Sequence, residues 1–502
     1  MAQRAIVIGG GFGGLSAAFR LQAAGVSTTL IERQDCVGGK ARNHPVGPHA
    51  IPGGPTVLTL REVFDDLFAV VGERLEDHVE VAPLEILAHH RWSPDERLDL
   101  YRDVDDSADA VEAFAGKTEA DGYRRFVADA SRIFSTIEEP FIKAPKPDLF
   151  AIARAVGPLG AHKIKPFDTM WSAICRHFRD PRLRQLFGRY ASYCGASPFQ
   201  APATLMLVAH AEQRGVWAID GGTAALAKAI AARFQRMGGD VLTGVEAREI
   251  VVERRAVCGV ETDGAGRLPA DTVVFNGDPA ALRGGLLGQR VTSTGFAMVP
   301  RTRTLSAVTL CASVVSETPL AYHTVAFSRD YPAEFDALFK RREMPEEPTI
   351  YVCTPDPPTG ADGRQGILIV MNAPADGDTK DYGEEDIARC QQQAMATLSR
   401  CGLNIDFKET CATTPSDFAD FLPGTGGAIY GRTSHGWTAS FQRPAPRTKV
   451  RGLYLAGGSV HPGPGAPMAS LSGQMAAKCL LQDFALAMPS RQVAMSGGIS
   501  TG

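Results

Sequence analysis

Glycines near the start of the chain have the spacing that could hold a phosphate. Gly9, Gly11 and Gly14 form the pattern G-x-G-x-x-G, with Phe12 and Gly13 between them. Gly9 permits a tight turn, Gly11 lets the backbone approach a pyrophosphate, and Gly14 lets the next helix pack closely on the strand. The pattern therefore predicts a pyrophosphate at the N-terminus of a helix.

An acidic side chain follows the glycines at the distance that a dinucleotide site requires. Glu32 ends the stretch STTLIE, about 20 residues further on, where a carboxylate can accept hydrogen bonds from ribose hydroxyls. Arg33 comes directly after it. The glycine pattern alone is a weak signal, but together with a strand before it, a helix after it and this acid it predicts a dinucleotide. These residues leave both NAD and FAD open.

Further backbone loops distinguish between the two cofactors. Gly39 and Lys40 lie in the stretch VGGK, and Gly54, Pro55 and Thr56 lie in GGPT. A nicotinamide half-site needs fewer such loops, whereas a large cofactor lying extended across the domain needs them for close backbone approach. The loops therefore favour FAD over NAD. The alternative is that they are two ordinary loop turns.

The far end of the chain has a similar arrangement. A short apolar strand is followed by Gly457 and Gly458, by a loop rich in glycine and proline, and by a helix that we expect to begin near Pro467 or Met468. The amides at a helix N-terminus carry positive partial charge. They would stabilise the negative charge that a reduced flavin carries near N1 and the C2 carbonyl.

Strands and helices must alternate to position these residues. We expect an α/β fold in which the cofactor domain is assembled from separated pieces of chain. The pattern predicts strands at 5–8, 27–32, 272–276 and 453–456, helices at 15–24 and 223–237, and a two-stranded ribbon at 248–262.

The composition of the chain argues against several classes of function. The 502 residues are 44% hydrophobic and 22% charged, and the net charge of −4 gives no general attraction for nucleic acid. The ten cysteines include no CxxC pair, so we expect reduced thiols and no metal site. No apolar run reaches the roughly 18 to 20 residues that a membrane span requires. We therefore expect a cytoplasmic protein without integral membrane segments.

A series of motifs resembles the bacterial phytoene desaturase-type family of carotenoid desaturases, within the flavin amine oxidase superfamily. In chain order they are GGGFGG, ERQDCVGGKAR, GGPTVLT, WAIDGGTAAL, GGAIYG and GLYLAGGSVHPGPGAPM. The resemblance spans nearly the whole chain. Two middle stretches, beginning LAYHTVAF and PFQAPATL, look most like the 1-hydroxycarotenoid 3,4-desaturases, also called hydroxyneurosporene or methoxyneurosporene desaturases.

The resemblance implies a role for individual residues. Glu32 would hold the ADP ribose, Lys40 would stand near the phosphates where the family usually has Arg, and the Val245 backbone would meet the adenine. Gly457, Gly458 and Met468 would meet the ribityl chain and the flavin. One departure is Pro52, which stands where the family usually has Asp, so an acid-base role cannot be carried over to that position.

The resemblance also implies a domain organisation. It comprises a discontinuous, Rossmann-like FAD-binding domain of the flavin amine oxidase and carotenoid desaturase type, a substrate-binding α+β domain and a helical, membrane-facing part. We assign 1–85, 215–285 and 445–486 to the first, 86–135 and 286–444 to the second, 136–214 to the third and 487–502 to a flexible tail.

The implied reaction is the oxidation of a carotenoid. A hydride and a proton leave adjacent carbons, the hydride goes to FAD, and an external acceptor such as oxygen or a quinone reoxidises the cofactor. His461 in the loop SVHPGPG is our candidate for the catalytic base, because imidazole can accept a proton near neutral pH. Its alternative role is to bond the loop backbone.

Such a substrate is almost insoluble in water, so the enzyme should dock on a membrane surface. We therefore expect peripheral association with the inner or photosynthetic membrane. Apolar side chains interleaved with lysines suit an anionic interface, although a core helix with a solvated edge explains the pattern equally well. The stretch contains Phe141, Phe150, Ile152, Leu159, Phe167 and Trp171 with Lys143, Lys146, Lys163 and Lys165.

Other functions fit the same motifs. Phytoene desaturases and carotenoid isomerases share the fold, and the isomerases use reduced FAD without net oxidation. An amine oxidase is a further alternative, although no cysteine precedes the last helix to hold the flavin covalently. A prenyl-lipid escort protein would bind without catalysis. Fold alone does not choose among these functions.

Overall fold

A parallel sheet holds the glycine motif at its carboxyl edge. The computed structural model describes residues 3–147, 154, 157, 167–295, 299–358, 363–436 and 439–487. The five strands are ordered β19-β13-β1-β2-β9 and every neighbouring pair is parallel. Their bounds are β1 Arg4–Ile8, β2 Ser27–Glu32, β9 Asp240–Thr243, β13 Thr272–Phe275 and β19 Leu453–Leu455. The sheet thus unites both ends of the chain with its middle, and the α/β prediction is confirmed.

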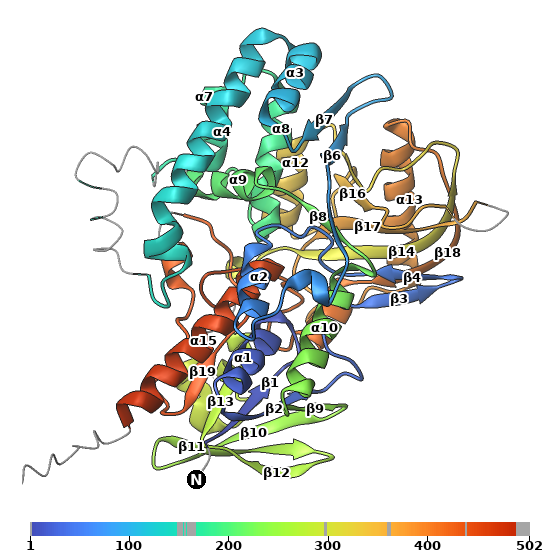
Figure 1. The fold of residues 1–502 in the computed structure, drawn as a ribbon. Helices are drawn as coiled ribbons and strands as arrows, with labels where there is room; N and C mark the ends of the chain where they lie inside the picture. Colours follow the sequence, from blue (N-terminus) through green and yellow to red (C-terminus); the bar gives the residue numbers. More distant parts are fainter. Residues whose placement is uncertain are drawn as a thin grey trace, which may run out of the picture.

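Both faces of this sheet are covered, which explains its apolar strands. Val7 packs among the helices of one face and Ile6 and Ile8 pack on the other face. The helices of the first face are α1 Phe12–Ala23, α2 Glu62–Ala69, α10 Gly222–Arg236 and α15 Ala466–Ala487. Figure 1 shows α1, α10 and α15 side by side above the strands.

The other face is covered by a small antiparallel sheet. Its strands are β10 Glu246–Glu253, β11 Ala256–Asp263 and β12 Gly266–Pro269, in the order β10-β11-β12. The predicted two-stranded ribbon is present as the antiparallel pair β10–β11, but the third strand, β12, was missed. This strand is short and largely exposed, so it lacks the apolar alternation from which a strand is recognised.

A second large sheet forms a separate part of the molecule. Its order is β18-β14-β17-β16-β15-β6-β7, and β15 and β6 form its parallel pair. Helix α13 Glu384–Arg400 covers one face and buries Ala394 and Leu398 against the strands. The strands are β6 Ile86–Arg91, β7 Arg97–Tyr101, β14 Ser306–Ser316, β15 His323–Ala326, β16 Ile350–Cys353, β17 Gln365–Ala373 and β18 Ile405–Thr413.

Helices form a third part beside this sheet (Figure 1). They are α3 Val104–Ala115, α4 Lys117–Ile137, α7 Met170–His177, α8 Pro181–Gly188 and α9 Leu207–Gln213. Buried aromatic rings join them, and the Phe178 and Phe187 rings stack with centroids 4.7 Å apart. Helices α3 and α4 share this core, although α3 and most of α4 come from the segment that we assigned to the substrate domain. The domain boundaries remain a prediction.

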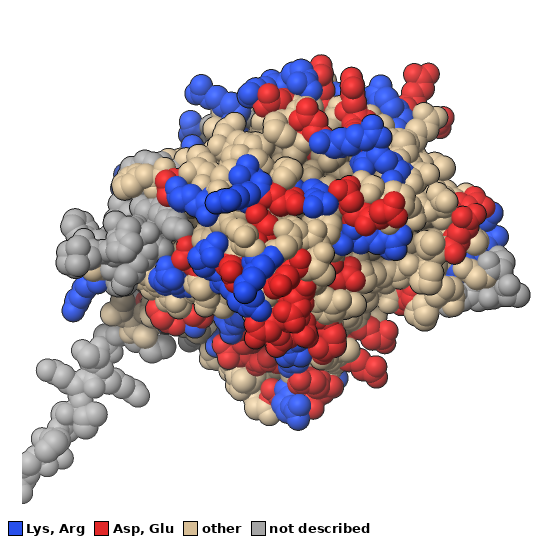
Figure 2. All heavy atoms as spheres, turned by 90° about the horizontal axis from the view of Figure 1, so that it is seen from above, with Lys and Arg blue, Asp and Glu red and all other residues tan. Residues whose placement is uncertain are grey.

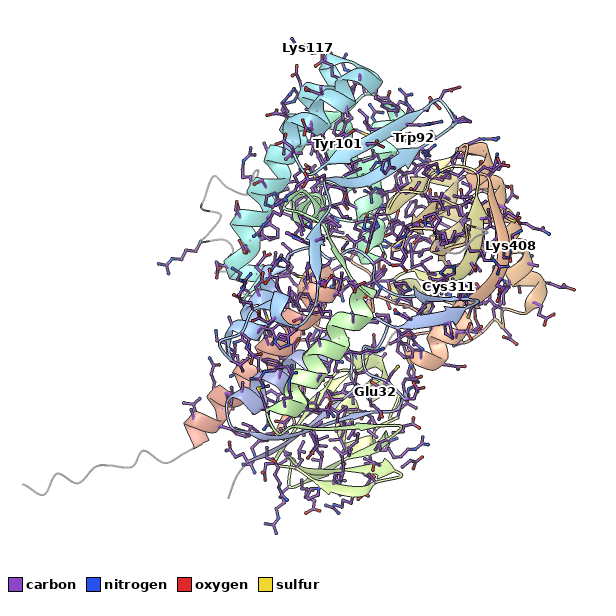
Figure 3. The ribbon with its side chains drawn as sticks, turned by 45° about the vertical axis from the view of Figure 1, so that its right-hand side comes forward. Glu32, Trp92, Tyr101, Lys117, Cys311 and Lys408 are labelled. Carbon is purple, nitrogen blue, oxygen red and sulfur yellow. The ribbon has the colours of Figure 1, made fainter. Side chains whose placement is uncertain are left out.

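Short elements connect these three parts. β3 pairs with β4 in a hairpin that packs on the second sheet, where Val46 and Ile51 are buried with Cys311, and β5 pairs with β8. The bounds are β3 Asn43–Val46, β4 His49–Pro52, β5 Val81–Pro83, β8 Trp217–Ile219, α11 Pro279–Arg283, α12 Tyr331–Asp336 and α14 Pro415–Phe421. Figure 3 places Glu32 in the cofactor part, Cys311 in the second sheet, and Trp92 and Tyr101 near the β6–β7 hairpin.

The charge of one face and the hydropathy of the helices bear on which partners the protein can bind. On the face seen from above in Figure 2, Lys and Arg side chains are interspersed with Asp and Glu side chains, so that face has no uniform charge. Among the described residues, no helix is both long enough and apolar enough to cross a membrane.

The stretch proposed to face a membrane is only partly described. Phe150, Ile152, Leu159, Lys163 and Lys165 lie outside the described residues, as does most of the predicted tail.

The described aromatic residues of that stretch differ in their environment. Trp171 packs against Phe199 with ring centroids 4.7 Å apart, and Phe141 packs against Phe441. Phe167 is 77% exposed. Of these three aromatic side chains, Phe167 is the one that is mostly exposed.

Candidate functional site

A cavity of about 1230 Å³ runs from the glycine motif to the helical part of the molecule. One end is lined by the loops that follow β1, β2 and β19. The other end is lined by side chains from the helices and from the second sheet. The predicted residues that line the cavity are Gly9, Gly11, Phe12, Gly13, Glu32, Arg33, Gly39, Lys40, Gly54, Pro55, Thr56, Val245, Gly457, Gly458, Pro467 and Met468.

The glycines of the motif have different surroundings. Gly9 has φ +98°, and a Cβ on Gly14 would overlap the carbonyl oxygen of Gly9, so both positions require glycine. A Cβ on Gly11 would lie 3.2 Å from the Asn276 amide nitrogen and 4.0 Å from the Gly39 Cα. A side chain there would crowd the Asn276 amide, and Gly11 itself lines the cavity. A dinucleotide pyrophosphate can lie there against the backbone.

Gly13 contributes to the site by helix packing. A Cβ on Gly13 would lie 2.8 Å from the amide nitrogen of Gly457, and a Cβ on Gly473 would overlap the carbonyl oxygen of Gly13. Glycine at 473 lets α15 approach α1 closely, and glycine at 13 lets α1 approach the loop after β19. The start of α15, with Pro467 and Met468, is thereby brought to the cavity. Phe12 supports the same turn through an edge-to-face contact with Phe64.

Glu32 lies at the end of β2 with its carboxylate on the cavity. Its Oε2 accepts a hydrogen bond from the Gly10 amide at 2.6 Å, and its Oε1 accepts one from the Gln34 amide at 2.9 Å. Each oxygen has a further lone pair for a ribose hydroxyl. The Val245 amide donates to the Glu32 carbonyl at 3.0 Å, which brings Val245 to the same end of the cavity.

Asn276 is a functional residue that the sequence reasoning missed. Its side-chain amide donates to the Gly9 carbonyl at 3.1 Å and holds the glycine turn against the end of β13. Asn276 directly follows the buried strand VVF at the carboxyl edge of the sheet. Because ligands bind at that edge, the position of Asn276 in the sequence could have identified it as a candidate site residue.

A group of buried charges lies beside the glycine loops. The Lys40 ammonium donates to the Ile429 carbonyl, and burial lowers the pKa of Lys40 to about 8 while the charge of Asp278 opposes the shift. Burial raises the pKa of Asp278, whose carboxylate accepts a hydrogen bond from the Ser459 hydroxyl at 2.5 Å. Arg443 donates to the Gly458 carbonyl at 3.1 Å. Asp278, Ser459 and Arg443 were not predicted.

Arg33 and the GGPT loop complete the cofactor end. Arg33 donates to the Asp420 carbonyl and lies on the cavity wall. A Cβ on Gly54 would overlap the carbonyl oxygen of Lys40, so this loop packs directly on the VGGK loop. Thr56 then joins the cofactor end to the second sheet, because its hydroxyl lies 2.6 Å from the Tyr351 hydroxyl.

Tyr351 continues a buried polar chain into the second sheet. Its hydroxyl also lies 2.6 Å from Nδ1 of His323. Burial, with a smaller contribution from the Arg189 charge, lowers the pKa of His323 to about 3. His323 is therefore neutral at physiological pH. The sequence reasoning missed both residues, because no local motif marks a contact between β15 and β16 and a loop near the N-terminus.

His461 is turned away from the cavity. Its imidazole is fully buried, and Nε2 lies 2.7 Å from the Phe141 carbonyl. Burial lowers the pKa of His461 to about 4. Pro462 lines the cavity, whereas the imidazole ties its loop to the backbone of residue 141. This geometry favours the backbone role, and the catalytic role stays a prediction.

The far half of the cavity is mostly apolar. Aliphatic and aromatic side chains from α4, α9 and the second sheet form its wall and can hold a long hydrocarbon without hydrogen-bonding needs. They include Phe134, Ile137, Leu205, Leu207, Val208, Ala211, Val325 and Val370.

The cofactor end fits FAD. A Cβ would intrude into the cradle at Gly11, a carboxylate lies where a ribose would bind, a cation lies beside the loops, and a helix begins at the far loop. The cavity continues from there into its apolar half. An extended dinucleotide and a long apolar molecule can therefore meet near Thr56 and Met468.

Comparisons with known proteins agree with this geometry. The family described as flavin containing amine oxidoreductase matches residues 12–481. A hydroxyneurosporene desaturase from Rubrivivax gelatinosus is 42% identical over 508 residues, covering 99% of this chain and 97% of that protein. Another, from Cereibacter sphaeroides, is 42% identical and covers 96% and 98%. A solved oxidoreductase from Methanosarcina mazei has the same fold, with a TM-score of 0.61 and 16% identity over 95% of this chain and 100% of that one.

The replacement Gly11→Ala should weaken FAD binding without unfolding the protein. The new methyl group would enter the cofactor space, and overpacking of about 1–3 kcal/mol corresponds to a loss of affinity of about tenfold or more. Flavin absorbance and a titration of the apoprotein measure the affinity. In the comparison variant Gly14→Ala, the methyl group would overlap the Gly9 carbonyl, so thermal unfolding should show a lower Tm. Wild-type FAD affinity in Gly11→Ala would contradict the assignment.

The affinity for FAD should fall as the pH rises through about 8, where Lys40 loses its proton. Above that pH the amine is neutral and no longer attracts the phosphates. Lys40→Arg should flatten this pH dependence because a guanidinium stays charged. Dissociation constants measured at several pH values test this, and identical profiles for the two proteins would show that Lys40 does not face the phosphates.

Proposed function

The chain belongs to the flavin containing amine oxidoreductase family, and we propose that it is an FAD-dependent carotenoid desaturase. It adds a C=C bond at the 3,4 position of a 1-hydroxy- or 1-methoxycarotenoid, such as 1-hydroxyneurosporene, in carotenoid biosynthesis. The observation that carries this proposal is the 42% identity, over nearly the full length, to proteins named hydroxyneurosporene desaturase. The apolar half of the cavity, which continues directly from the cofactor end, supports it.

The residues that line the cavity would position the substrate and the cofactor for the proposed reaction. Bound FAD supplies the two-electron oxidant. The apolar wall aligns the polyene and excludes water, while the N-terminus of α15 presents positive partial charge at the cofactor end. The substrate would lose a hydride to the bound cofactor and a proton, from the neighbouring carbon, to water at the cavity opening. Because the existing conjugation delocalises positive charge, a strong enzymic base is not required, which agrees with the buried position of His461.

We propose that the protein takes its substrate from a membrane surface. Phe167 lines the cavity and is 77% exposed, so the cavity reaches the surface beside an apolar side chain. Lys143 contributes little to an anionic interface, because its ammonium already lies 3.0 Å from Glu138 and 2.8 Å from Glu139. An external acceptor, oxygen or a quinone, reoxidises the cofactor.

Purified holoprotein in liposomes should convert 1-hydroxyneurosporene to a product with a red-shifted absorption maximum, because conjugation is extended. Neurosporene and phytoene serve as comparison substrates, and the apoprotein serves as the control without FAD. A shift with phytoene alone would indicate a phytoene desaturase. Isomerisation without consumption of an acceptor would indicate an isomerase, and carotenoid binding without any spectral change would indicate an escort protein.

His461→Gln should retain most of the desaturase activity. The glutamine amide can still donate to the Phe141 carbonyl, and the pKa of about 4 means that His461 does not titrate near neutral pH. His461→Ala should lower the Tm, because it leaves that buried carbonyl without its donor. The decisive measurement is kcat of His461→Gln as a function of pH, which should have the same profile as the wild type. Loss of turnover in both variants, with Tm unchanged, would assign the base to His461.

A further inference from the structure

A buried ion pair lies in the wall of the apolar half of the cavity. Arg189 Nη2 and Glu212 Oε1 are 3.2 Å apart, and these residues are 4% and 3% exposed. The Tyr193 hydroxyl lies 3.2 Å from Glu212 Oε2 and also accepts a hydrogen bond from Arg189. Arg189, Tyr193 and Glu212 all line the cavity. We refer to these three residues as the polar triad.

A pure hydrocarbon ligand would offer the polar triad no hydrogen-bond partner. Moving two charges out of water is costly, and a buried ion pair is often no more stable than apolar residues of similar volume. The pair is also incompletely satisfied, since Arg189 Nε is buried without a hydrogen-bond partner among the described residues. Such an unused donor in a cavity wall points to an oxygen atom of a ligand.

The polar triad is close to the loop that would hold the flavin. The Arg189 charge contributes to the electrostatic environment of His323, and Tyr193 contributes to that of Tyr351. Tyr351 in turn contacts Thr56 of the GGPT loop at 2.6 Å. The polar triad therefore lies near the Tyr351 and His323 side chains, which reach the cofactor end of the cavity through Thr56.

We propose that the polar triad binds the hydroxyl group of the substrate and so determines substrate specificity. This inference rests on the proposed function. The hydroxyl oxygen accepts a hydrogen bond from the Arg189 guanidinium, and the hydroxyl proton is donated to the Glu212 carboxylate. In a 1-hydroxycarotenoid this oxygen is only a few bonds from the 3,4 carbons, so its binding site must lie beside the flavin loop. Binding there places the 3,4 bond at the cofactor.

The proposal distinguishes three ligands by their hydrogen bonds. A 1-hydroxycarotenoid uses both the Arg189 donor and the Glu212 acceptor. A 1-methoxycarotenoid uses the donor alone, and a carotenoid without oxygen uses neither. A site built to bond a hydroxyl rejects analogues that lack it, because its own polar groups are left without partners. The affinity should therefore decrease in that order.

Tyr193→Phe and Tyr190→Phe form a matched pair of variants. Each removes one hydroxyl from the same Glu212 carboxylate, and the Tyr190 hydroxyl donates to Oε1 at 2.7 Å. Tyr193 lines the cavity, whereas Tyr190 is buried behind it at 2% exposure. A purely structural role for the hydroxyls predicts the same effect in both variants. A role in substrate binding predicts a larger effect in Tyr193→Phe, because the Tyr193 hydroxyl bridges Arg189 and Glu212 and so positions both groups that bond the substrate hydroxyl. The Tyr190 hydroxyl contacts Glu212 alone.

The experiment measures binding of 1-hydroxyneurosporene, its 1-methoxy counterpart and neurosporene to each holoprotein in liposomes, by quenching of flavin fluorescence. The wild type should bind the hydroxylated carotenoid about tenfold or more tightly than neurosporene. Tyr193→Phe should reduce that ratio several-fold, with little change in the affinity for neurosporene. Tyr190→Phe should retain the ratio.

The outcomes separate this inference from the proposed function. A wild type that desaturates the hydroxylated carotenoid but binds all three ligands equally would overturn the inference and leave the proposed function standing. Equal changes of the ratio in the two variants would also overturn it. If Tyr193→Phe does not fold, the order of the three wild-type affinities decides. A wild type that oxidises no carotenoid would overturn the proposed function and this inference with it.

Discussion

The parallel pairing of β13 with β1 and β19 is the constraint on which the rest of the structure depends. The three strands come from distant parts of the chain, and their carboxyl ends meet at one edge. That edge brings Gly9, Asn276 and Gly457 into contact, with the Asn276 amide holding the Gly9 carbonyl at 3.1 Å. Close packing of α1 on α15 then depends on Gly473, where a Cβ would overlap the Gly13 carbonyl oxygen, and close packing of α1 on the loop after β19 depends on Gly13. The cofactor end of the cavity exists only because these contacts are made without side chains.

The cavity combines two environments that are chemically opposed. Its cofactor end presents backbone amides, a carboxylate and charged side chains to a dinucleotide, while its far half presents aliphatic and aromatic side chains. The polar chain of Thr56, Tyr351 and His323 crosses the boundary, with both contacts at 2.6 Å. A continuous cavity of this kind lets an apolar substrate meet a polar cofactor without solvent between them. The polar triad in the apolar wall is the exception that needs a chemical explanation.

Much of the cofactor site was predictable because its residues are close in sequence to the turns they form. The strand, glycine turn, helix and acid from β1 to Glu32 lie in one short stretch, and each local pattern has a direct conformational consequence. Residues that act through tertiary contacts were missed, as Asn276 and Asp278 show. The exposed strand β12 was missed for a different reason, because it buries too little apolar surface to leave a periodic signal.

The sequence by itself determined the α/β class, the cofactor motifs and, through resemblance, the kind of substrate. Those features rest on local backbone geometry and on apolar periodicity, which short stretches of chain encode. Only the tertiary structure decided that His461 bonds the Phe141 backbone rather than facing the cavity, and that Arg189, Tyr193 and Glu212 share one wall. The physical reason is that buried polar side chains find their partners across elements that are distant in sequence. Such contacts therefore cannot be predicted from a pattern of neighbouring residues in the sequence.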